Sequence, residues 1–404
     1  MPDPTTQGEA GEHPEPAVLS PAEERSVLSA AAQAAGARLI TSRTRSIHHR
    51  PQRSRSVVHE AVLEVEGERS EVLLVTHVDI RGYPEGAFVL AADDLQVAVW
   101  RFPFDPYLPG LPPAISPVRV RELLDQLGAA PGAVRLRTRA YRPTRRAVVE
   151  VRVDGPASGR VLYFKVLPLA RARSVARRHR HLDAAGLPVP RLVGSAERQG
   201  IVAIEALGGA TLTATLTTTA PLPMPAAILE LSQRFAASGI RGSRDPRAFA
   251  DPVRHVALLS ELLPHRADEI AALARVASEV DAALVGVHGD LHPGQLLLGP
   301  DGAITGVLDV DGAGQGYQAH DAGNLIAHLG ATADLHPPSR AVSAGYAREV
   351  EAAYAEVVGI EPLARATAAA WLGLATSAHR AQEPSWREQV EQRVDRAAQL
   401  LHRS

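Results

Sequence analysis

The sequence predicts an α+β protein in which strand-rich regions precede a mainly helical region. Short runs of β-branched and apolar residues are frequent before Gly209, and longer segments with apolar residues at helical spacing dominate after Pro223. Within the helical region, residues 287–314 are an exception, because they have the pattern of a short hairpin.

The composition argues against several classes of function. The 404 residues carry a formal net charge of −2, which gives no reason to expect a nucleic-acid partner. The chain lacks cysteine, so disulfides and thiolate metal sites are excluded. Residues 1–16 do not resemble a signal peptide, and no run of about twenty apolar residues predicts a membrane span. We therefore expect a cytoplasmic protein, whose oligomeric state the sequence does not predict.

The first part of the chain is predicted to form an additional α+β domain. Residues 1–19 are rich in Pro, Gly and acidic side chains and are expected to be a disordered tail. Ser20 is a typical N-cap, followed by Pro21 at the first helical position and Gly36 at the helix end. Strands are then predicted at residues 56–65, 71–78, 87–91 and 95–100, and a helix at residues 116–127. We assign residues 20–130 to this N-terminal cap domain.

The hairpin pattern at residues 287–314 brings three oxygen-bearing side chains together. Its predicted strands are residues 296–298 and 304–310, and the segment between them supplies Pro and Gly for a tight turn. Folding the strands about this turn places Gln295 almost opposite Asp309, with Asp290 shortly before them. Two carboxylates and an amide match phosphoryl transfer, which needs an acceptor-orienting carboxylate and oxygen ligands for Mg²⁺.

Lysine usage gives a second indication. The chain holds 43 lysine and arginine residues, and only Lys165 is lysine. It lies in a β-type run, residues 160–167, where a kinase places a flexible cation against the α- and β-phosphates of a nucleotide. A lone lysine on an exposed strand is the alternative, but the Asp290 segment downstream favours the phosphate contact.

These motifs resemble a known family. Residues 288–295, HGDLHPGQ, are similar to the H-G-D-x-x-x-x-N segment of the aminoglycoside phosphotransferase superfamily, which are small-molecule kinases with a protein-kinase-like fold. The superfamily also includes maltokinases and choline kinases, and the resemblance extends over residues 135–404. It implies a bilobal fold, with a small antiparallel-sheet N-lobe at residues 131–209 and a mainly helical C-lobe, containing the catalytic hairpin, at residues 210–404.

The resemblance implies roles for the residues that would carry the reaction. Asp290 would orient or deprotonate the acceptor hydroxyl. Gln295 and Asp309 would hold Mg²⁺, and Lys165 would contact the phosphates of ATP or GTP.

It also implies supporting and nucleotide-binding positions. His288 and Asp321 would brace the catalytic loop, and backbone groups of Glu205 and Leu207 would bond the adenine edge. Residues 154–159 contain two glycines and are the nearest candidate for a phosphate-covering loop, but a plain hairpin turn explains them better.

Two departures from the family pattern are present. Gln295 stands where most members have Asn, although maltokinases also have Gln there. Its longer side chain still presents a coordinating oxygen. The predicted helix at residues 169–185 has no Glu to orient Lys165, and the register places Val175 at that position. Either another acid reaches Lys165, or the ion pair is absent, or the site is degraded.

One segment of the cap domain is similar in sequence to one segment of the N-lobe. Residues 49–77 resemble residues 141–165, because each has an Arg-Pro-x-Arg start, a strand, a polar turn and a second strand. The first copy has Thr76 or His77 near the position of the lysine. The two segments are either related lobes, of which the first lacks the phosphate contact, or similar by chance.

The helices of the predicted C-lobe leave the acceptor unidentified. They are expected at residues 224–237, 250–263, 267–283, 323–329, 339–357, 362–379 and 385–401. A pocket for a polycationic aminoglycoside would be strongly acidic. The acids available here are better explained as a solvated surface: Glu261, Asp268, Glu269, Glu279 and Asp281.

The sequence therefore predicts a small-molecule kinase that uses Mg²⁺ and ATP or GTP to phosphorylate a hydroxyl acceptor. Two alternatives stay open. One is a maltokinase-like sugar kinase, and the other is a pseudokinase that binds nucleotide or regulates without catalysis.

Overall fold

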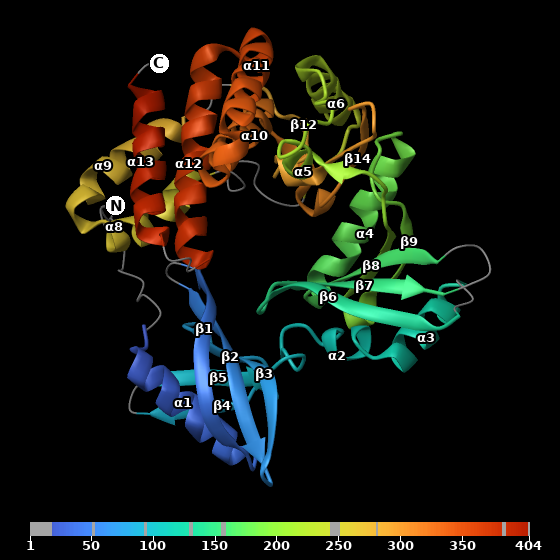
Figure 1. Cartoon of the computed structure of the whole chain (residues 1–404), viewed down its shortest axis with the longest axis vertical. Helices are drawn as coiled ribbons and strands as arrows, with labels where there is room; N and C mark the ends of the chain where they lie inside the picture. The colour runs from blue at the N-terminus through green and yellow to red at the C-terminus, as the bar shows by residue number, and fades with distance from the viewer. Residues whose placement is uncertain are drawn as a thin grey trace, which may run out of the picture. The chain divides into compact units, whose positions relative to one another are not determined.

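The computed structural model divides the chain into two compact units, Met1–Phe102 and Pro103–Ser404 (Figure 1). It describes residues 18–50, 53–92, 95–128, 132–154, 159–242, 251–279, 282–381 and 385–402. The predicted tail at residues 1–19 therefore lies almost wholly outside the described residues. Residues 103–130, which the sequence analysis assigned to the cap domain, are counted with the second unit.

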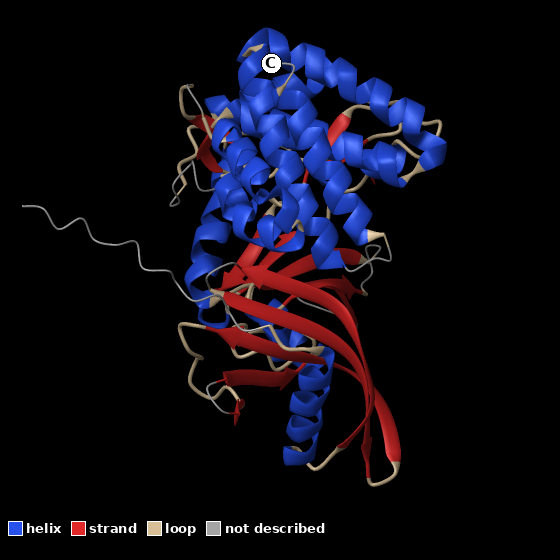
Figure 2. Cartoon of the chain, turned by 90° about the vertical axis from the view of Figure 1, so that its left-hand side faces the viewer, coloured by secondary structure: helices blue, strands red, loops and turns tan. Residues whose placement is uncertain are grey.

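The first unit is a five-stranded antiparallel sheet packed against one helix (Figure 2). Helix α1 (Pro21–Ala34) begins with the predicted cap, in which Ser20 and Glu23 exchange side-chain to backbone hydrogen bonds. Leu28 of α1 is completely buried in the core beneath the sheet. The strands, in the order β1-β2-β3-β5-β4, are β1 (Arg38–Arg50), β2 (Ser54–Val65), β3 (Glu68–Asp79), β4 (Val89–Ala92) and β5 (Leu95–Arg101).

Strand β1 is a long element that the sequence did not predict. Its sequence is polar and arginine-rich, and Ile47 is its only buried residue. The strand lies at the edge of the sheet and pairs with β2 alone. An edge strand with little buried surface needs no alternating apolar pattern, so the pattern that would have revealed it is missing.

The second unit begins with two short helices and another five-stranded antiparallel sheet. Val149, Phe164 and Ala203 are completely buried at the centre of this sheet. The helices are α2 (Leu111–Ala114) and α3 (Pro117–Gln126), and α4 (Leu169–Ala184) follows the third strand of the sheet. The strands, in the order β6-β7-β8-β10-β9, are β6 (Val134–Arg142), β7 (Arg146–Val153), β8 (Arg160–Val166), β9 (Leu192–Ala196) and β10 (Ile201–Glu205).

The two sheets have the same strand order, which favours related lobes over chance similarity. In the first unit Val57 pairs with Thr76, and in the second Val148 pairs with Lys165. Each of these valines opens the Val-Val pair that follows an Arg-Pro-x-Arg start, so the two strand pairs correspond. Thr76 therefore stands at the position of Lys165, and the first sheet has a hydroxyl where the second has an ammonium group.

A buried carboxylate anchors the turn between β6 and β7. Asp105 is only 2% exposed, and it accepts hydrogen bonds of 2.9 Å from the Tyr141 hydroxyl, the Thr144 N–H and the Tyr107 N–H. Burial raises the pKa of Asp105, although these three donors oppose the rise. The turn is therefore fixed to residues outside the sheet.

Replacing Asp105 should measure this anchoring. Asp105→Ala is expected to lower the free energy of unfolding by about 2–4 kcal/mol, because three donors lose their acceptor. Urea denaturation at pH 7 gives the value. Asp125→Ala removes an exposed acid from nearby α3 and should cost less than about 0.5 kcal/mol. Equal losses in the two variants would contradict the anchoring role.

The rest of the second unit is mainly helical (Figure 2). Gly209, with φ of 121°, leads the chain into β11 (Ala210–Thr211), and a Cβ there would lie 2.7 Å from the Leu298 carbonyl oxygen. The helices are α5 (Leu212–Thr215), α6 (Pro225–Ala237), α8 (Val256–Leu262), α9 (Ala267–Ala277), α10 (Gln318–Leu335), α11 (Arg340–Val358), α12 (Ile360–Ala381) and α13 (Trp386–Leu401). No helix in the described part of the chain is both long and apolar enough to cross a membrane.

Three helices differ from their predicted bounds. α10 extends well beyond residues 323–329, because its first turn carries polar residues, among them Asp321, which binds the backbone of His288, and these residues hide the apolar spacing. α9 ends at Ala277, where the prediction continued to residue 283. The predicted helix at residues 250–263 appears as a short 3₁₀ turn, η2 (Pro252–His255), followed by α8, and residue 250 lies outside the described residues.

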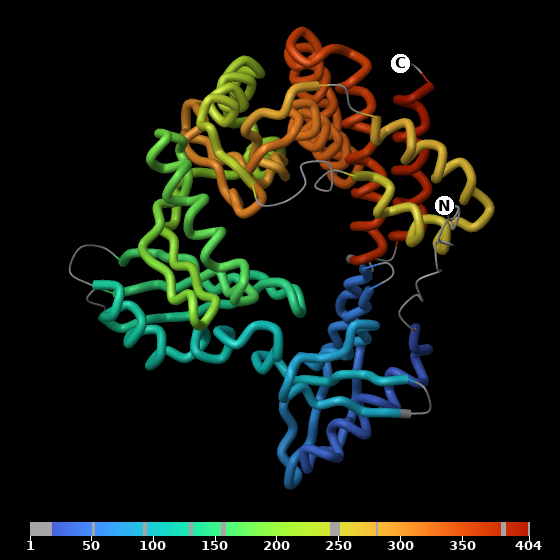
Figure 3. The backbone as a smooth tube through the Cα atoms, turned by 180° about the vertical axis from the view of Figure 1, so that it is seen from behind, coloured from blue at the N-terminus to red at the C-terminus, as the bar shows by residue number. Residues whose placement is uncertain are grey.

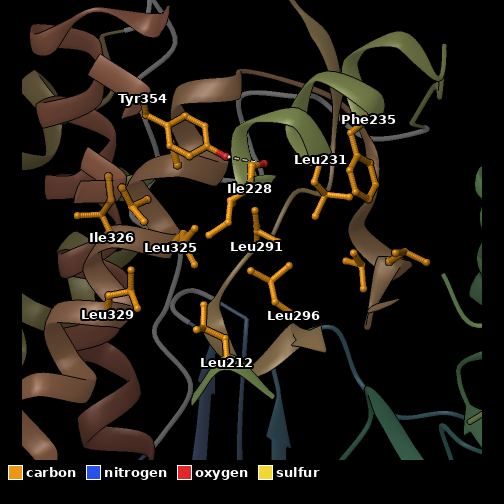
Figure 4. Packing of buried hydrophobic residues seen from close by; sticks show 14 of the residues in the cluster. Leu212, Ile228, Leu231, Phe235, Leu291, Leu296, Leu325, Ile326, Leu329 and Tyr354 are labelled. Carbon is orange, nitrogen blue, oxygen red and sulfur yellow. Dashed lines mark hydrogen bonds between the residues drawn. The ribbon is translucent and has the colours of Figure 1, made fainter. Parts of the chain in front are cut away.

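Two apolar cores stabilise the helical region. One surrounds the hairpin and includes Leu291, which follows Asp290, and Leu296, which follows Gln295 (Figure 4). Tyr354 is completely buried in this core, and its hydroxyl bonds to that of Ser232 at 2.5 Å and donates to the Ile228 carbonyl at 3.4 Å. The other core joins α9, α12 and α13, and Figure 3 shows α12 and α13 side by side. The hairpin is thus packed into a rigid helical support.

Candidate active site

The predicted hairpin is present. β13 (Leu296–Leu298) and β14 (Ile304–Val307) are antiparallel neighbours, and β11 pairs with the other side of β13. The Gly299 N–H donates to the Ala303 carbonyl at 2.8 Å and closes the turn. The Pro and Gly residues of this segment therefore form the reversal that the sequence predicts.

Gln295 and Asp309 lie at the same end of this hairpin. The Leu308 N–H donates to the Gln295 carbonyl at 2.8 Å, which places the two predicted metal ligands on adjacent strand ends. The second strand stops at Val307 and not at residue 310, because Asp309 has φ of 56° and directs the chain into the 3₁₀ turn η5 (Val310–Gly312). Such a left-handed conformation is uncommon outside glycine and often marks a functional position.

The loop that carries Asp290 is held by a carboxylate from α10. This loop follows β12 (Val285–Val287) and leads into η4 (Pro293–Gln295). Asp321 accepts hydrogen bonds from the backbone of His288 at 2.7 Å and of Gly289 at 2.8 Å. Burial raises the pKa of Asp321, and His288 and the backbone N–H donors of the loop oppose this rise. Asp321 therefore lies where a loop brace is needed.

His288 connects the Asp290 loop with the end of the hairpin. Its ring is completely buried, its Nδ1 lies 3.3 Å from the Asp290 N–H, and its Nε2 lies 2.9 Å from the Leu308 carbonyl. Both ring nitrogens are therefore engaged, one by the Asp290 loop and the other by the end of the hairpin. A small shift of His288 would therefore be transmitted to both Asp290 and Asp309.

The Asp290 carboxylate is open to water but set among protein atoms. It accepts a long hydrogen bond from the Asn324 side-chain amide, at 3.4 Å. The surrounding protein is the largest cause that raises the pKa of Asp290 to about 6, and Asp309 and Asp321 add to the rise while His288 opposes it. Since water reaches the side chain, solvent screening also moderates the shift. The group is still mainly ionised at pH 7 and is more basic than an ordinary Asp.

Lys165 is buried between two acids. Its side chain is 8% exposed, and its Nζ lies 2.5 Å from Asp311 Oδ1 and 3.4 Å from Asp309 Oδ1. Burial alone would lower the pKa of Lys165, but Asp311 and then Asp309 reverse this effect and raise it. Burial likewise opposes ionisation of Asp311, yet Lys165 and His179 bring its pKa below the usual range. The pair is therefore fully charged at neutral pH.

Asp311 takes the place of the Glu that α4 lacks as the acidic partner of Lys165. Val175 of α4 is completely buried in an apolar core and has no polar role. One turn later, His179 places Nε2 3.8 Å from Asp311 Oδ1. Another acid does reach Lys165, and it comes from the loop after Asp309 and not from α4.

Arg146, like Asp311, is a site residue that the sequence did not predict. It opens β7, and its Nη1 lies 2.9 Å and 3.1 Å from the two carboxylate oxygens of Asp309. Lys165 and Arg146 together bring the pKa of Asp309 below its ordinary value, against the effect of burial. Arg146 directly follows the Arg-Pro-x-Arg start and is two residues before Val148, the strand partner of Lys165.

The side chains of the candidate site lie within one segment that matches a known protein family. Residues 146–359, more than half of the chain, match the sequence pattern of the phosphotransferase enzyme family. The chain belongs to this family. The match starts at Arg146 and includes Lys165, the Asp290 loop and the hairpin, so the family predicted from the HGDLHPGQ segment is confirmed.

Several solved phosphotransferase structures are similar to the chain. Aminoglycoside phosphotransferase APH(4)-Ia is 17% identical, with 70% of this chain and 97% of that chain covered and a TM-score of 0.48. Choline kinase from Cryptosporidium parvum Iowa II is 12% identical, with coverages of 67% and 89% and a TM-score of 0.44. Macrolide 2'-phosphotransferase MphH from Brachybacterium faecium is 19% identical, with coverages of 68% and 98% and a TM-score of 0.39. No curated protein sequence matches the chain.

The residues at the end of the hairpin fit the Mg²⁺ that kinases of this phosphotransferase family would use. Asp309 offers a carboxylate that is 25% exposed, and Gln295 offers an amide oxygen whose hydrogen bond from the His292 N–H is long, at 3.3 Å. Mg²⁺ commonly takes one or two protein oxygens and completes its shell with water and phosphate oxygens. The described residues contain no group of three or more His, Cys, Asp or Glu that could hold a metal, and a site of this kind needs none.

In the predicted adenine-binding segment, residues 205–207, two of the three backbone N–H groups already have acceptors. The N–H groups of Glu205 and Ala206 already donate to backbone carbonyls, and the Glu205 carboxylate pairs with Arg160 at 2.6 Å and Arg191 at 2.7 Å. Among the described residues, the Leu207 N–H has no backbone acceptor. The N–H of Leu207 is thus better placed than that of Glu205 to donate to a nucleotide base.

The turn at residues 154–159 lies at the opposite end of β7 and β8 from Lys165. Strand pairing sets Val153 opposite Arg160, whereas Lys165, five residues further along β8, is opposite Val148. Residues 155–158 lie outside the described residues. A plain turn, which the sequence analysis preferred, agrees with this position.

The acids considered for a polycation pocket lie on the surface. Glu269 pairs with Arg266 at 2.8 Å, and Glu279 pairs with Arg365 at 3.3 Å. Glu261 and Asp268 are exposed, and Asp281 lies outside the described residues. The structure therefore gives no support for an acidic aminoglycoside pocket on these helices.

Proposed function

We propose that this family member transfers the γ-phosphoryl group of Mg-ATP or Mg-GTP to a hydroxyl group of a small molecule. The arrangement around the hairpin is the observation that carries the proposal. It combines an accessible carboxylate of raised pKa, Asp290, with the carboxylate of Asp309 and the Lys165–Asp311 ion pair. Phosphoryl transfer depends mainly on positioning and charge neutralisation, which these groups supply.

Asp290 would act on the acceptor. Its carboxylate would orient the hydroxyl and take the proton as the acceptor oxygen bonds to the γ-phosphorus. The bond between that phosphorus and the β–γ bridging oxygen breaks, and the nucleoside diphosphate leaves. His288 and Asp321 would keep the loop in place while the bonds change.

Lys165, held by Asp311, would bind the α- and β-phosphates as a fixed cation. Gln295 and Asp309 would hold Mg²⁺, which supplies charge neutralisation at the phosphates when it is bound. The backbone N–H of Leu207 would bond the base. Both ATP and GTP fit this description, and the acceptor class is a matter for experiment.

An acceptor screen tests the proposal directly. Wild type and Asp309→Ala are each incubated with Mg-ATP or Mg-GTP and pools of aminoglycosides, macrolides, maltose, simple sugars, choline and amino alcohols. Mass spectrometry is expected to show one phosphorylated product with wild type and at least about a hundredfold less with Asp309→Ala, because the carboxylate at the metal position is lost.

Nucleotide binding separates the alternatives. A maltokinase-like enzyme would phosphorylate maltose in the same screen, and a pseudokinase would bind nucleotide without forming any product. If calorimetry shows that wild type binds no nucleotide at millimolar Mg-ATP or Mg-GTP, the kinase proposal is wrong.

A further inference from the structure

The turn between β6 and β7 carries arginines and lies at the same end of the sheet as Lys165. Arg142 and Arg146 are paired across it, and Thr144 near its tip has φ of 62°. Arg146 is two residues from Val148, the strand partner of Lys165. Asp105 fixes the turn through the Thr144 N–H. The arginines are therefore presented by an anchored turn and not by a loose loop.

Arg146 uses only part of its guanidinium. Nη1 contacts both oxygens of Asp309, while Nε is buried and has no hydrogen-bond partner among the described residues. The two side chains are about equally accessible, at 26% and 25%. A planar guanidinium with unused donors is suited to a second oxyanion, and phosphate is the one that it matches best.

Two of the acidic side chains near this turn have cationic partners before any ligand binds. Asp290, Asp309 and Asp311 contribute three negative charges, and the ammonium group of Lys165 pairs with the last two. Arg146 neutralises Asp309 from the β7 side. A metal ion that approached Asp309 would therefore meet a cation already bound to both carboxylate oxygens.

Arg142 adds a further positive charge on the same turn. Burial, followed by the charges of Arg146 and Arg380, lowers the pKa of Arg142 to about 10, while Asp290 and Asp309 oppose the change. The guanidinium remains charged at neutral pH. Entry of a polyanion relieves this repulsion between arginines, and entry of a free cation increases it.

We propose that Arg146 exchanges ligands, so that it holds Asp309 when no nucleotide is present and moves to the nucleotide phosphates when Asp309 takes the metal. The inference rests on the proposed function and extends it to the order of binding. Arg146 opposes binding of free metal and favours binding of the metal–nucleotide complex. The ligand class for the turn is a nucleoside polyphosphate, and the turn replaces a glycine-rich cover with a charged one.

Metal binding without nucleotide provides the first test. Free Mn²⁺ is counted by electron paramagnetic resonance in titrations of nucleotide-free wild type and Arg146→Met. The variant is expected to bind Mn²⁺ about tenfold more tightly, because the competing cation is absent. Calorimetry with Mg²⁺ and a non-hydrolysable ATP analogue should show the opposite change, about tenfold weaker binding.

Arg145→Met is the matched control. Arg145 lies on the same turn and is exposed, so the variant removes an equal charge and leaves the Arg146–Asp309 pair in place. Both affinities should change by less than about threefold. Arg146→Lys keeps the charge but loses the planar fork, and it serves as the test if the methionine variant does not fold.

The two changes of opposite sign make the exchange easy to overturn. Mn²⁺ affinity that is unchanged or weaker in Arg146→Met excludes competition for Asp309. Unchanged binding of the metal–nucleotide complex excludes the phosphate contact while leaving the proposed kinase function intact. Failure of wild type to bind the complex at all overturns both proposals.

Discussion

Asp290→Asn is expected to lower the rate of phosphoryl transfer by about 10³-fold and to change Mg-nucleotide affinity by less than about threefold. The amide is nearly the same size but cannot take the acceptor proton. The backbone contacts of the loop, including the two hydrogen bonds that Asp321 accepts, do not depend on the carboxylate of Asp290. Steady-state kinetics with the acceptor from the screen and calorimetry with Mg-nucleotide give the two numbers.

The pH profile identifies the group responsible. The pKa of Asp290 is raised to about 6, and the ionised form is the active base. In wild type, kcat/KM should therefore fall about tenfold per pH unit below about 6 and be level above it. Asp290→Asn should show a low, flat profile over this range. A variant that keeps the acidic limb would assign the proton transfer to another group.

Asp311→Ala is expected to have the largest effect on stability, lowering the free energy of unfolding by about 3–5 kcal/mol. The change leaves the ammonium group of Lys165 buried with only the more distant Asp309 as a partner, at 3.4 Å. Urea denaturation at pH 7 measures the loss. Glu351→Ala removes an exposed acid from α11 and should cost less than about 0.5 kcal/mol.

The double variant Asp311→Leu with Lys165→Met is the companion test. It replaces both buried charges by apolar groups and should recover most of the lost stability, although it cannot bind phosphates. Folding lowers the pKa of Asp311 and raises that of Lys165. The pair therefore contributes its full stability at every pH between the ordinary pKa values of the two groups. Equal stability of wild type and Asp311→Ala at pH 7 would show that Lys165 does not need this partner.

Motif spacing was sufficient to predict the hairpin and its neighbours. Pro and Gly between two apolar runs fixed the turn, so the spacing alone could pair Gln295 with Asp309. The long helices were also predictable, since buried faces repeat at helical spacing. The capped start at Ser20 was predicted for a similar local reason.

Contacts between distant segments could not be predicted in this way. Asp311 reaches Lys165 across 146 positions of sequence, and Arg146 reaches Asp309 across 163. Neither residue has a local pattern that distinguishes it from the many other acids and arginines. Strand β1 was missed for the opposite reason, because an exposed edge strand is under little selection by burial.

The burial of Lys165 gives the protein a built-in chemical reporter. Reagents that acylate amines react with the neutral form of a lysine and leave arginine unmodified. Lys165 carries the only ε-amine of the chain, and in the folded protein it is both enclosed and held in its protonated form by Asp311. Acylation at this one position therefore counts the molecules in which the sheet and the hairpin have separated.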